Sequence, residues 1–296
     1  RIMGYLEARK IATTFNPQQA DFVKTKKLDL SDTTSNWLTF CTRMSEYDTH
    51  IDNSTWLFAA LTITAVVLTA LIAGDDDTFG GFNDLLIGVF IVCAIVMLVM
   101  YILTKRNDLP NRFRNCITPL VRILKEDAAE DAILHLKLDL TSCMVKAKIV
   151  DSNTRNNITT TVYDDPWLSG SVDLIDRTQL AFSARDRVTR LVKTKTNARG
   201  KTKSKTKTKT VSIVTATLGL NKKFYFIEDI EALKRDFFDV GFKNNVKVKE
   251  GEKQYLITSK SAYKQSVYNK NDFNLSWILS QATELYQKFS MVKGVK

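Results

Sequence analysis

The chain has 296 residues, of which 43 are Lys or Arg and 32 are Asp or Glu, so its formal net charge is +11. Hydrophobic residues make up 44% of the chain and charged residues 25%, a balance that excludes a disordered or collagen-like protein. Four cysteines exclude a disulfide scaffold, and two histidines leave little material for metal or acid–base chemistry.

Residues 1–54 are predicted to be an N-terminal helical segment on the cytosolic side. Asn16 followed by Pro17 is typical of a helix start, because proline is favoured at the first helical position. A further helix is expected to begin at Asp32 or Thr33 and to continue into the apolar sequence that follows.

Residues 55–104 are predicted to form a transmembrane helical hairpin. The spans, Trp56–Ala73 and Leu85–Leu103, contain no charged residue. At 1.5 Å per residue each helix would cover about 27–29 Å, close to the roughly 30 Å hydrocarbon core of a bilayer. Two buried core helices are the alternative, but runs this long and this close together favour the lipid bilayer as partner.

The charges flanking the hairpin predict its orientation. The connecting loop, residues 74–84, holds four aspartates and no Lys or Arg, whereas Lys105, Arg106, Arg112 and Arg114 follow the second span. The positive-inside rule therefore predicts that both termini are cytoplasmic and that a short acidic loop lies on the outer side.

Small residues recur within the hairpin. Ala65, Thr69 and Ala73 are four residues apart, and Gly88 lies in the second span. Small side chains let helices approach closely, so these four are interpreted as helix-packing positions, within the hairpin or between protomers of a homo-oligomer. A pore lined by Thr62 and Thr69 stays open as an alternative, and it would require such an oligomer.

After the hairpin, residues 105–131 are predicted to be a helical linker that Pro119 interrupts, and residues 132–296 a basic, β-rich domain. Period-two patterns predict strands at Leu134–Leu140, Val145–Ile149, Ile158–Tyr163, Gly170–Ile175 and Gln179–Ala184, separated by turns at residues 151–153, 164–166 and 176–177. A hairpin around residues 250–252 and a closing helix over residues 273–289 follow. The expected fold class is an integral membrane protein with a two-helix hairpin and an α+β cytosolic domain dominated by antiparallel strands.

The most informative segment is residues 185–209, which holds eleven Lys or Arg and one acid and so carries +10 of the net +11. Lys and Thr alternate there with the period of a strand, which predicts one long basic β-hairpin of Arg187–Thr196 with Lys201–Thr210. Because directly opposed lysines repel, the predicted register places lysine opposite threonine across a connection of two or four residues.

This ribbon supplies the candidate binding residues. The candidate polyanion-binding residues are Lys193, Lys195, Arg199, Lys201, Lys203, Lys205, Lys207 and Lys209. Three interpretations stay open: a solvated edge that lysines protect from aggregation, a site for nucleic acid or an acidic protein, and a contact with anionic lipid headgroups. Few aromatic residues lie among the lysines, so stacking on nucleic-acid bases is not indicated.

No sequence motif indicates catalysis. Phosphate-binding loops, dinucleotide fingerprints, nucleophile elbows and paired-histidine zinc motifs are absent, and no two cysteines have metal-ligand spacing. Asp164 and Asp165 beside Trp167 could form a carboxylate pair, but the pattern is more typical of a turn. We expect a non-enzymatic membrane-anchored scaffold with no cofactor and no metal, whose basic ribbon docks a polyanion; an oligomeric pore or channel-like effector gated by its soluble domain is the alternative.

Overall fold

The computed structural model describes residues 3–73, 83–196, 199–227, 229–231, 245–264 and 273–289. The chain divides into two compact units. The first consists of Arg1–Thr25 with Phe40–Pro110, and the second of Lys26–Thr39 with Asn111–Lys296. Most of the predicted acidic loop, residues 74–82, lies outside the described residues.

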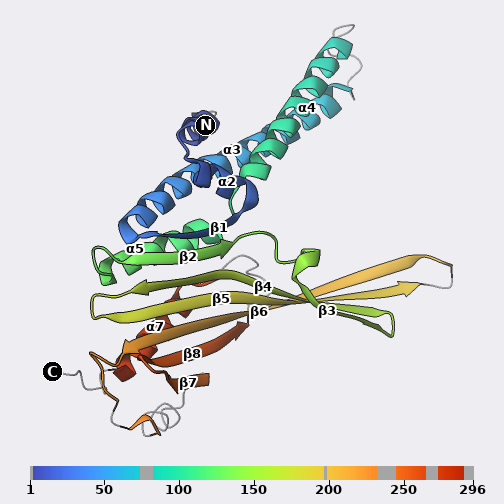
Figure 1. The fold of residues 1–296 in the computed structure, drawn as a ribbon. Helices are drawn as coiled ribbons and strands as arrows, with labels where there is room; N and C mark the ends of the chain where they lie inside the picture. The colour runs from blue at the N-terminus through green and yellow to red at the C-terminus, as the bar shows by residue number, and fades with distance from the viewer. Residues whose placement is uncertain are drawn as a thin grey trace. The chain divides into compact units, whose positions relative to one another are not determined.

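The first unit is helical (Figure 1). It contains α1 (Met3–Thr13), α2 (Pro17–Thr25), α3 (Thr34–Ala73) from Phe40 onward, and α4 (Asn83–Asn107). The backbone N–H of Gln19 donates to the Asn16 side chain over 2.8 Å, which caps α2 where the sequence predicted a helix start. Asp48 anchors the end of α4, because its carboxylate accepts the backbone N–H of Leu109 at 2.9 Å.

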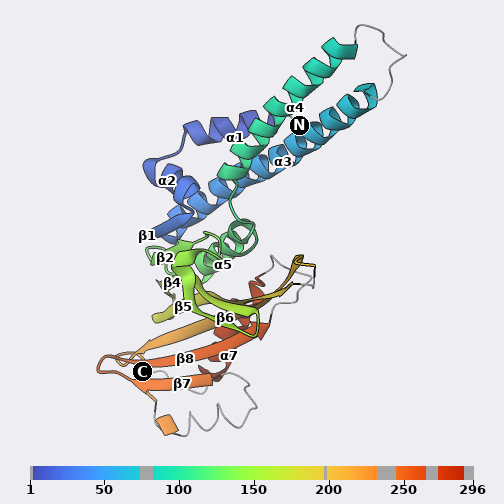
Figure 2. The ribbon, with the colours of Figure 1, turned by 90° about the vertical axis from the view of Figure 1, so that its right-hand side faces the viewer.

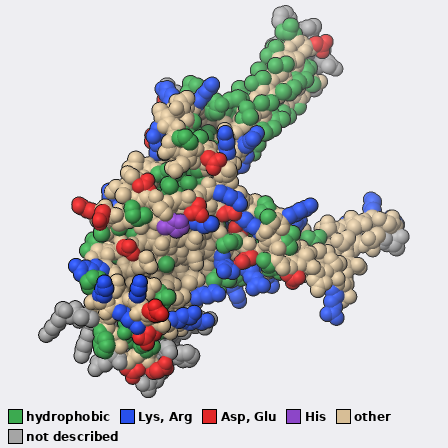
Figure 3. Space-filling view, in the orientation of Figure 1, with side chains coloured by type: hydrophobic (Ala, Val, Ile, Leu, Met, Phe, Trp, Pro, Cys, Tyr) green, Lys and Arg blue, Asp and Glu red, His purple; other side chains and the backbone are tan. Residues whose placement is uncertain are grey.

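Two of these helices are long and apolar enough to cross a membrane. α3 is continuous over 40 residues and α4 over 25. Of the most apolar eighteen-residue stretch, 11% is buried in α3 and none in α4. Apolar side chains consequently cover the surface of the paired helices (Figure 3), and a patch of this extent is typical of a surface that water does not cover.

The second unit is an eight-stranded antiparallel sheet. Its strand order is β1-β2-β4-β5-β6-β8-β7, with β3 pairing to β4. Two helices, α5 (Thr118–Asp127) and α7 (Ser276–Phe289), lie on one face of the sheet, and the opposite face is called the open face below (Figures 1 and 2). The strands are β1 (Lys27–Thr33), β2 (Ile133–Asp139), β3 (Ile149–Arg155), β4 (Ile158–Asp173), β5 (Thr178–Thr196), β6 (Thr202–Asn221), β7 (Asn245–Glu250) and β8 (Gln254–Lys264).

The alternation predicted for β2 is confirmed. Leu134, Leu136 and Leu138 are buried under the helices, while His135 and Lys137 are exposed on the open face. The indole N–H of Trp37, in the first turn of α3, donates to the Leu134 carbonyl at 2.8 Å. β1 was not predicted, since residues 1–54 were expected to be helical; its side chains alternate only weakly in polarity, and its pairing with β2 determines its conformation.

Three local predictions are wrong. Residues 146–148 form a 3₁₀ turn instead of a strand, because Lys148 turns inward to bind two carboxylates. Residues 164–166 are not a turn but part of β4, where a β-bulge between Pro166 and Leu168 accommodates the missing proline N–H. Residues 151–153 belong to β3, and the reversal falls at Asn156 and Asn157, whose φ angles are 52° and 60°.

A buried cluster of four charges joins β4 and β5 on the helix-covered face. Asp165 and Asp186 are directly opposite each other and are 2% and 1% exposed. Lys148 Nζ lies 2.7 Å from Asp165, and an Arg112 guanidinium nitrogen lies 2.5 Å from Asp186. The two cations stabilise the ionised forms of these opposed, buried carboxylates.

Hydrogen bonds and a further carboxylate complete the cluster. The Ser212 hydroxyl of β6 donates to Asp186 over 2.6 Å, and Lys148 also lies 3.2 Å from Asp139. Burial raises the pKa of Asp165 even though Lys148 opposes the shift. At Asp139 burial also acts to raise the pKa, but hydrogen bonds from Thr141 and the charge of Lys148 outweigh it, so that pKa falls to about 2.

Replacing Asp186 with Asn should destabilise the fold strongly, because it leaves the Arg112 guanidinium without its buried counter-charge. We expect a loss of about 3–5 kcal/mol in the free energy of unfolding. Asp164→Asn is the matched control: Asp164 pairs over 3.1 Å with Arg185, whose side chain is 51% exposed, so the expected cost is about 0–1 kcal/mol. Denaturant unfolding followed by tryptophan fluorescence measures both, and equal costs would contradict the interpretation of the cluster.

Candidate polyanion interface

The basic segment lies on two paired strands. β5 pairs with β6 from Thr178↔Leu220 to Thr196↔Thr202, and β6 pairs with β8 from Val211 onward. We call Val188–Thr196 with Thr202–Thr210 the arm. It projects past the end of β8 in Figure 1. β4 flanks the arm on the β5 side as far as the pair Ile158↔Lys193.

The predicted register of the arm is wrong. Thr196 is opposite Thr202, so five residues connect the strands. The residue numbers of two directly opposed residues therefore add up to an even number, which pairs odd-numbered residues with odd-numbered ones. Lys193 therefore faces Lys205, and Lys195 faces Lys203. Register in an antiparallel sheet is set by the pairing that buries one face. Here Val188, Ala184 and Phe182 of β5 are buried, and continuous pairing from that core determines where the lysines fall.

The corrected register gathers the charges. Directly opposed residues share a face, so one face of the arm presents two lysines of β5 and four of β6, whereas the predicted register divided them between two faces. We call this the lysine face; it consists of Lys193, Lys195, Lys203, Lys205, Lys207 and Lys209. All six are exposed, and none forms an ion pair with any residue that the structure describes.

Like charges at this separation oppose the pairing of the arm. Along one strand, alternate side chains are about 6.6–6.8 Å apart, and opposed pairs are closer still. The chain contains no Asp or Glu from residue 187 to residue 221, so no neighbour on either strand offsets the repulsion. A ligand that brings negative charge to this face would remove a repulsion that the arm otherwise carries.

The other face of the arm is uncharged apart from Arg190. It presents hydroxyl side chains, including Thr194, Thr206 and Thr208, and the hydroxyls of Thr196 and Thr202 lie 3.1 Å apart. The arm is thus chemically two-sided: ammonium groups on one face and hydroxyls on the other.

The open face carries further cations, of which those on β7 and β8 were not anticipated from the sequence. Register places Arg185 and Arg187 of β5 on this face, together with Lys260 and Lys264 of β8 and Lys247 and Lys249 of β7. Arg185 is paired with Asp164, whereas the lysines add positive charge to the open face beyond the arm, on β7 and β8. The pairing of β8 with β6 determines which side chains of β7 and β8 share a face with the lysines of β6. These four lysines could be found from the sequence only if that pairing were known.

The remaining candidate residues lie as follows. Arg199 and Lys201 are exposed in the connection between the strands. In the first unit, Ala65 is buried, and Thr69 donates its hydroxyl to the Ala65 carbonyl at 2.8 Å. Ala73 and Gly88 are exposed in the single chain. Thr62 likewise bonds within its helix, to the Phe58 carbonyl at 2.8 Å.

The paired aspartates do not form a surface site. Asp165 is enclosed in the buried charge cluster, and Asp164 faces the opposite side of the sheet, bound to Arg185. Within the described parts of the chain, no group of three or more His, Cys, Asp or Glu side chains could hold a metal ion.

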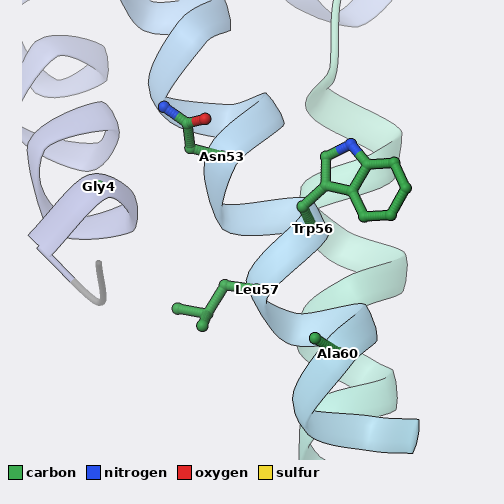
Figure 4. A pocket seen from close by; sticks show the side chains of 5 residues that line it. All are labelled: Gly4, Asn53, Trp56, Leu57 and Ala60. Carbon is green, nitrogen blue, oxygen red and sulfur yellow. The ribbon is translucent and has the colours of Figure 1, made fainter.

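A groove of about 510 Å³ lies between α1 and α3, lined by Gly4, Asn53, Trp56, Leu57 and Ala60 (Figure 4). Trp56, at the start of the apolar stretch, is 77% exposed beside it. A β-carbon at Gly4 would meet the Ser54 hydroxyl at 3.3 Å, so glycine permits the close approach of the two helices. Among the described residues that line the groove, Asn53 contributes a side-chain amide and Trp56 an indole ring.

Comparison of the chain with protein-family models, curated protein sequences and solved structures finds no match. The lysine face and the apolar helices are therefore the features from which a function is inferred.

A cysteine pair tests the register of the arm. In a background without the native cysteines, Lys195→Cys with Lys203→Cys should form a disulfide on mild oxidation, because the two positions are directly opposed. Lys195→Cys with Thr202→Cys, the control, should not, because those side chains lie on opposite faces. Mobility on non-reducing gels reports both, and cross-linking of the control pair alone would contradict the register described above.

Proposed function

We propose that this protein is a membrane-anchored docking protein that binds a polyanion through the lysine face. The observation that carries the proposal is the register of the arm, which opposes Lys193 to Lys205 and Lys195 to Lys203 with no neutralising carboxylate among the residues that the structure describes. Six uncompensated ammonium groups on one face exceed what protection of a sheet edge requires. The mechanism is electrostatic capture, with no bond chemistry.

The two apolar helices supply the anchor in this proposal. α3 and α4 would form a hairpin across the bilayer, and the charges after α4 would keep the arm and both termini on the cytoplasmic side. Tethering raises the effective concentration of the arm for any partner at the membrane. A polyanion would then be held at the membrane surface by a contact that salt weakens.

Binding should depend steeply on salt. For the full chain in detergent micelles, six lysine–phosphate contacts predict a slope of about −5 in log K against log salt with duplex DNA as probe. Replacing Lys203, Lys205, Lys207 and Lys209 with Thr should reduce the slope to about −2, because four contacts are lost while a good strand former is retained. Fluorescence anisotropy measures both.

The matched control removes four lysines from other surfaces: Lys24, Lys125, Lys146 and Lys253 are exposed and lie outside the arm. This variant should keep the wild-type slope. Anionic vesicles and polyglutamate run in parallel identify the kind of polyanion. If no polyanion binds at low salt, or if both variants lose binding equally, the proposal fails.

The proposed orientation is tested by labelling. In a cysteine-free background, a single cysteine at Asp76→Cys or at Lys207→Cys is exposed to a membrane-impermeant maleimide in sealed vesicles of known sidedness. Because the flanking charges set the orientation, the two positions should label from opposite sides. Labelling of both positions from the same side would contradict a membrane-crossing hairpin.

A further inference from the structure

The arm has a second binding property besides its charge, namely the outer edge of β6. Among the described residues, β6 pairs with β8 from Val211 onward, so Thr202–Thr210 has β5 as its one strand neighbour. Alternate backbone N–H and C=O groups along such an edge point away from the sheet and can pair with another strand. The edge also carries four residues of the lysine face.

A second copy of this chain is a poor occupant of that edge. Two identical strands that pair antiparallel about a two-fold axis place the axis at the midpoint of a directly opposed pair, so opposed positions sum to an even number. With the axis at Thr206, where the two edges overlap fully, each of the four lysines of this edge would face a lysine of the copy. The repulsion already present between β5 and β6 would be repeated at the new interface.

A strand with acidic residues at every second position would be attracted to this edge, where a second copy of the chain would be repelled. On one side of such a strand, each carboxylate would lie beside one of Lys203, Lys205, Lys207 and Lys209, because both strands repeat side chains every 6.6–6.8 Å or so. On the other side, its alternate residues would meet hydroxyls such as Thr206 and Thr208. The arm thus offers such a strand backbone hydrogen-bonding groups, positive charges and a matching spacing of side chains.

We propose that β6 captures an extended acidic segment of a partner protein by strand addition, with acidic residues at alternate positions facing the lysine face. The inference rests on the proposed function and names the class of its polyanion. A duplex nucleic acid or a lipid surface would use the charges of the arm but would leave the period-two match and most of the backbone edge unused.

The test uses the full chain in detergent micelles and three synthetic peptides. The first alternates Thr and Glu over about ten residues, enough to span the edge. The second has the same composition with all Glu residues in one block. The third is the alternating peptide with every second backbone nitrogen methylated. It is prepared in two versions, one methylated at the odd-numbered and one at the even-numbered nitrogens. Methylation retains the charge and prevents strand pairing.

The alternating peptide should bind about tenfold tighter or more than the blocked one, because only its carboxylates match the lysines one to one. It should also slow amide hydrogen exchange in Thr202–Thr210. At least one of the two methylated versions should lose both the tighter binding and the slower exchange. A variant with Lys203, Lys205, Lys207 and Lys209 changed to Glu should prefer a Thr–Lys peptide instead, which keeps the test informative if the wild-type peptide binds weakly.

Equal binding of the alternating and blocked peptides, without protection of these amides, would overturn strand addition. The salt-dependent binding of polyanions would still stand in that case, so the two failures are distinguishable. If duplex DNA or anionic vesicles protect the same amides more strongly than the alternating peptide does, the partner class proposed here is wrong.

Discussion

The antiparallel pairing of β5 with β6 is the constraint on which the candidate site depends. It runs without a register shift from a buried core, where Phe182 and Ala184 lie under the helices, to the exposed arm. Burial at one end fixes the register, and the register then opposes lysines at the other end. The core therefore holds together a charged surface that would not pair favourably by itself.

The buried charge cluster stands at the junction between those two regions. Asp186 lies two residues before the arm begins at Val188, and its carboxylate is bound by Arg112 and Ser212. Arg112 also lies over the Trp167 ring at 5.1 Å, which adds a cation–π contact. Arg112 follows α4 closely in sequence, so the segment that leaves the apolar helices contributes directly to the base of the arm.

Much of the fold could be predicted from single-residue patterns. The apolar runs predicted α3 and α4, and the alternation of leucines predicted β2, because the spacing of hydrophobic residues indicates which face of an element is buried. The 3₁₀ turn at Lys148 could not be predicted, since its two carboxylate partners are Asp139 and Asp165, one of them distant in sequence. A lysine on a period-two pattern is normally read as exposed, and only the fold brings these three together.

The candidate site was predictable in composition and not in geometry. Repulsion between lysines favours a register with lysine opposite threonine, but each opposed charge pair contributes at most about 1 kcal/mol. The continuous pairing from the buried core contributes more and determines the register. Likewise, Lys260 and Lys264 lie far along the chain, and only the pairing of β8 with β6 places them on the open face. Long-range pairing is the information that a period-two pattern lacks.

The reactivity of the lysines, measured in membranes of the cells that make the protein, shows whether the lysine face is a docking site. An amine-reactive reagent and mass spectrometry would compare the lysine face with Lys24, Lys125 and Lys253, before and after a wash at about 1 M salt, where screening acts within about 3 Å. A bound polyanion predicts that the lysine face is protected at first and becomes reactive after the wash, while the other lysines do not change. Full reactivity of the lysine face before the wash would contradict the claim that this surface is a docking site.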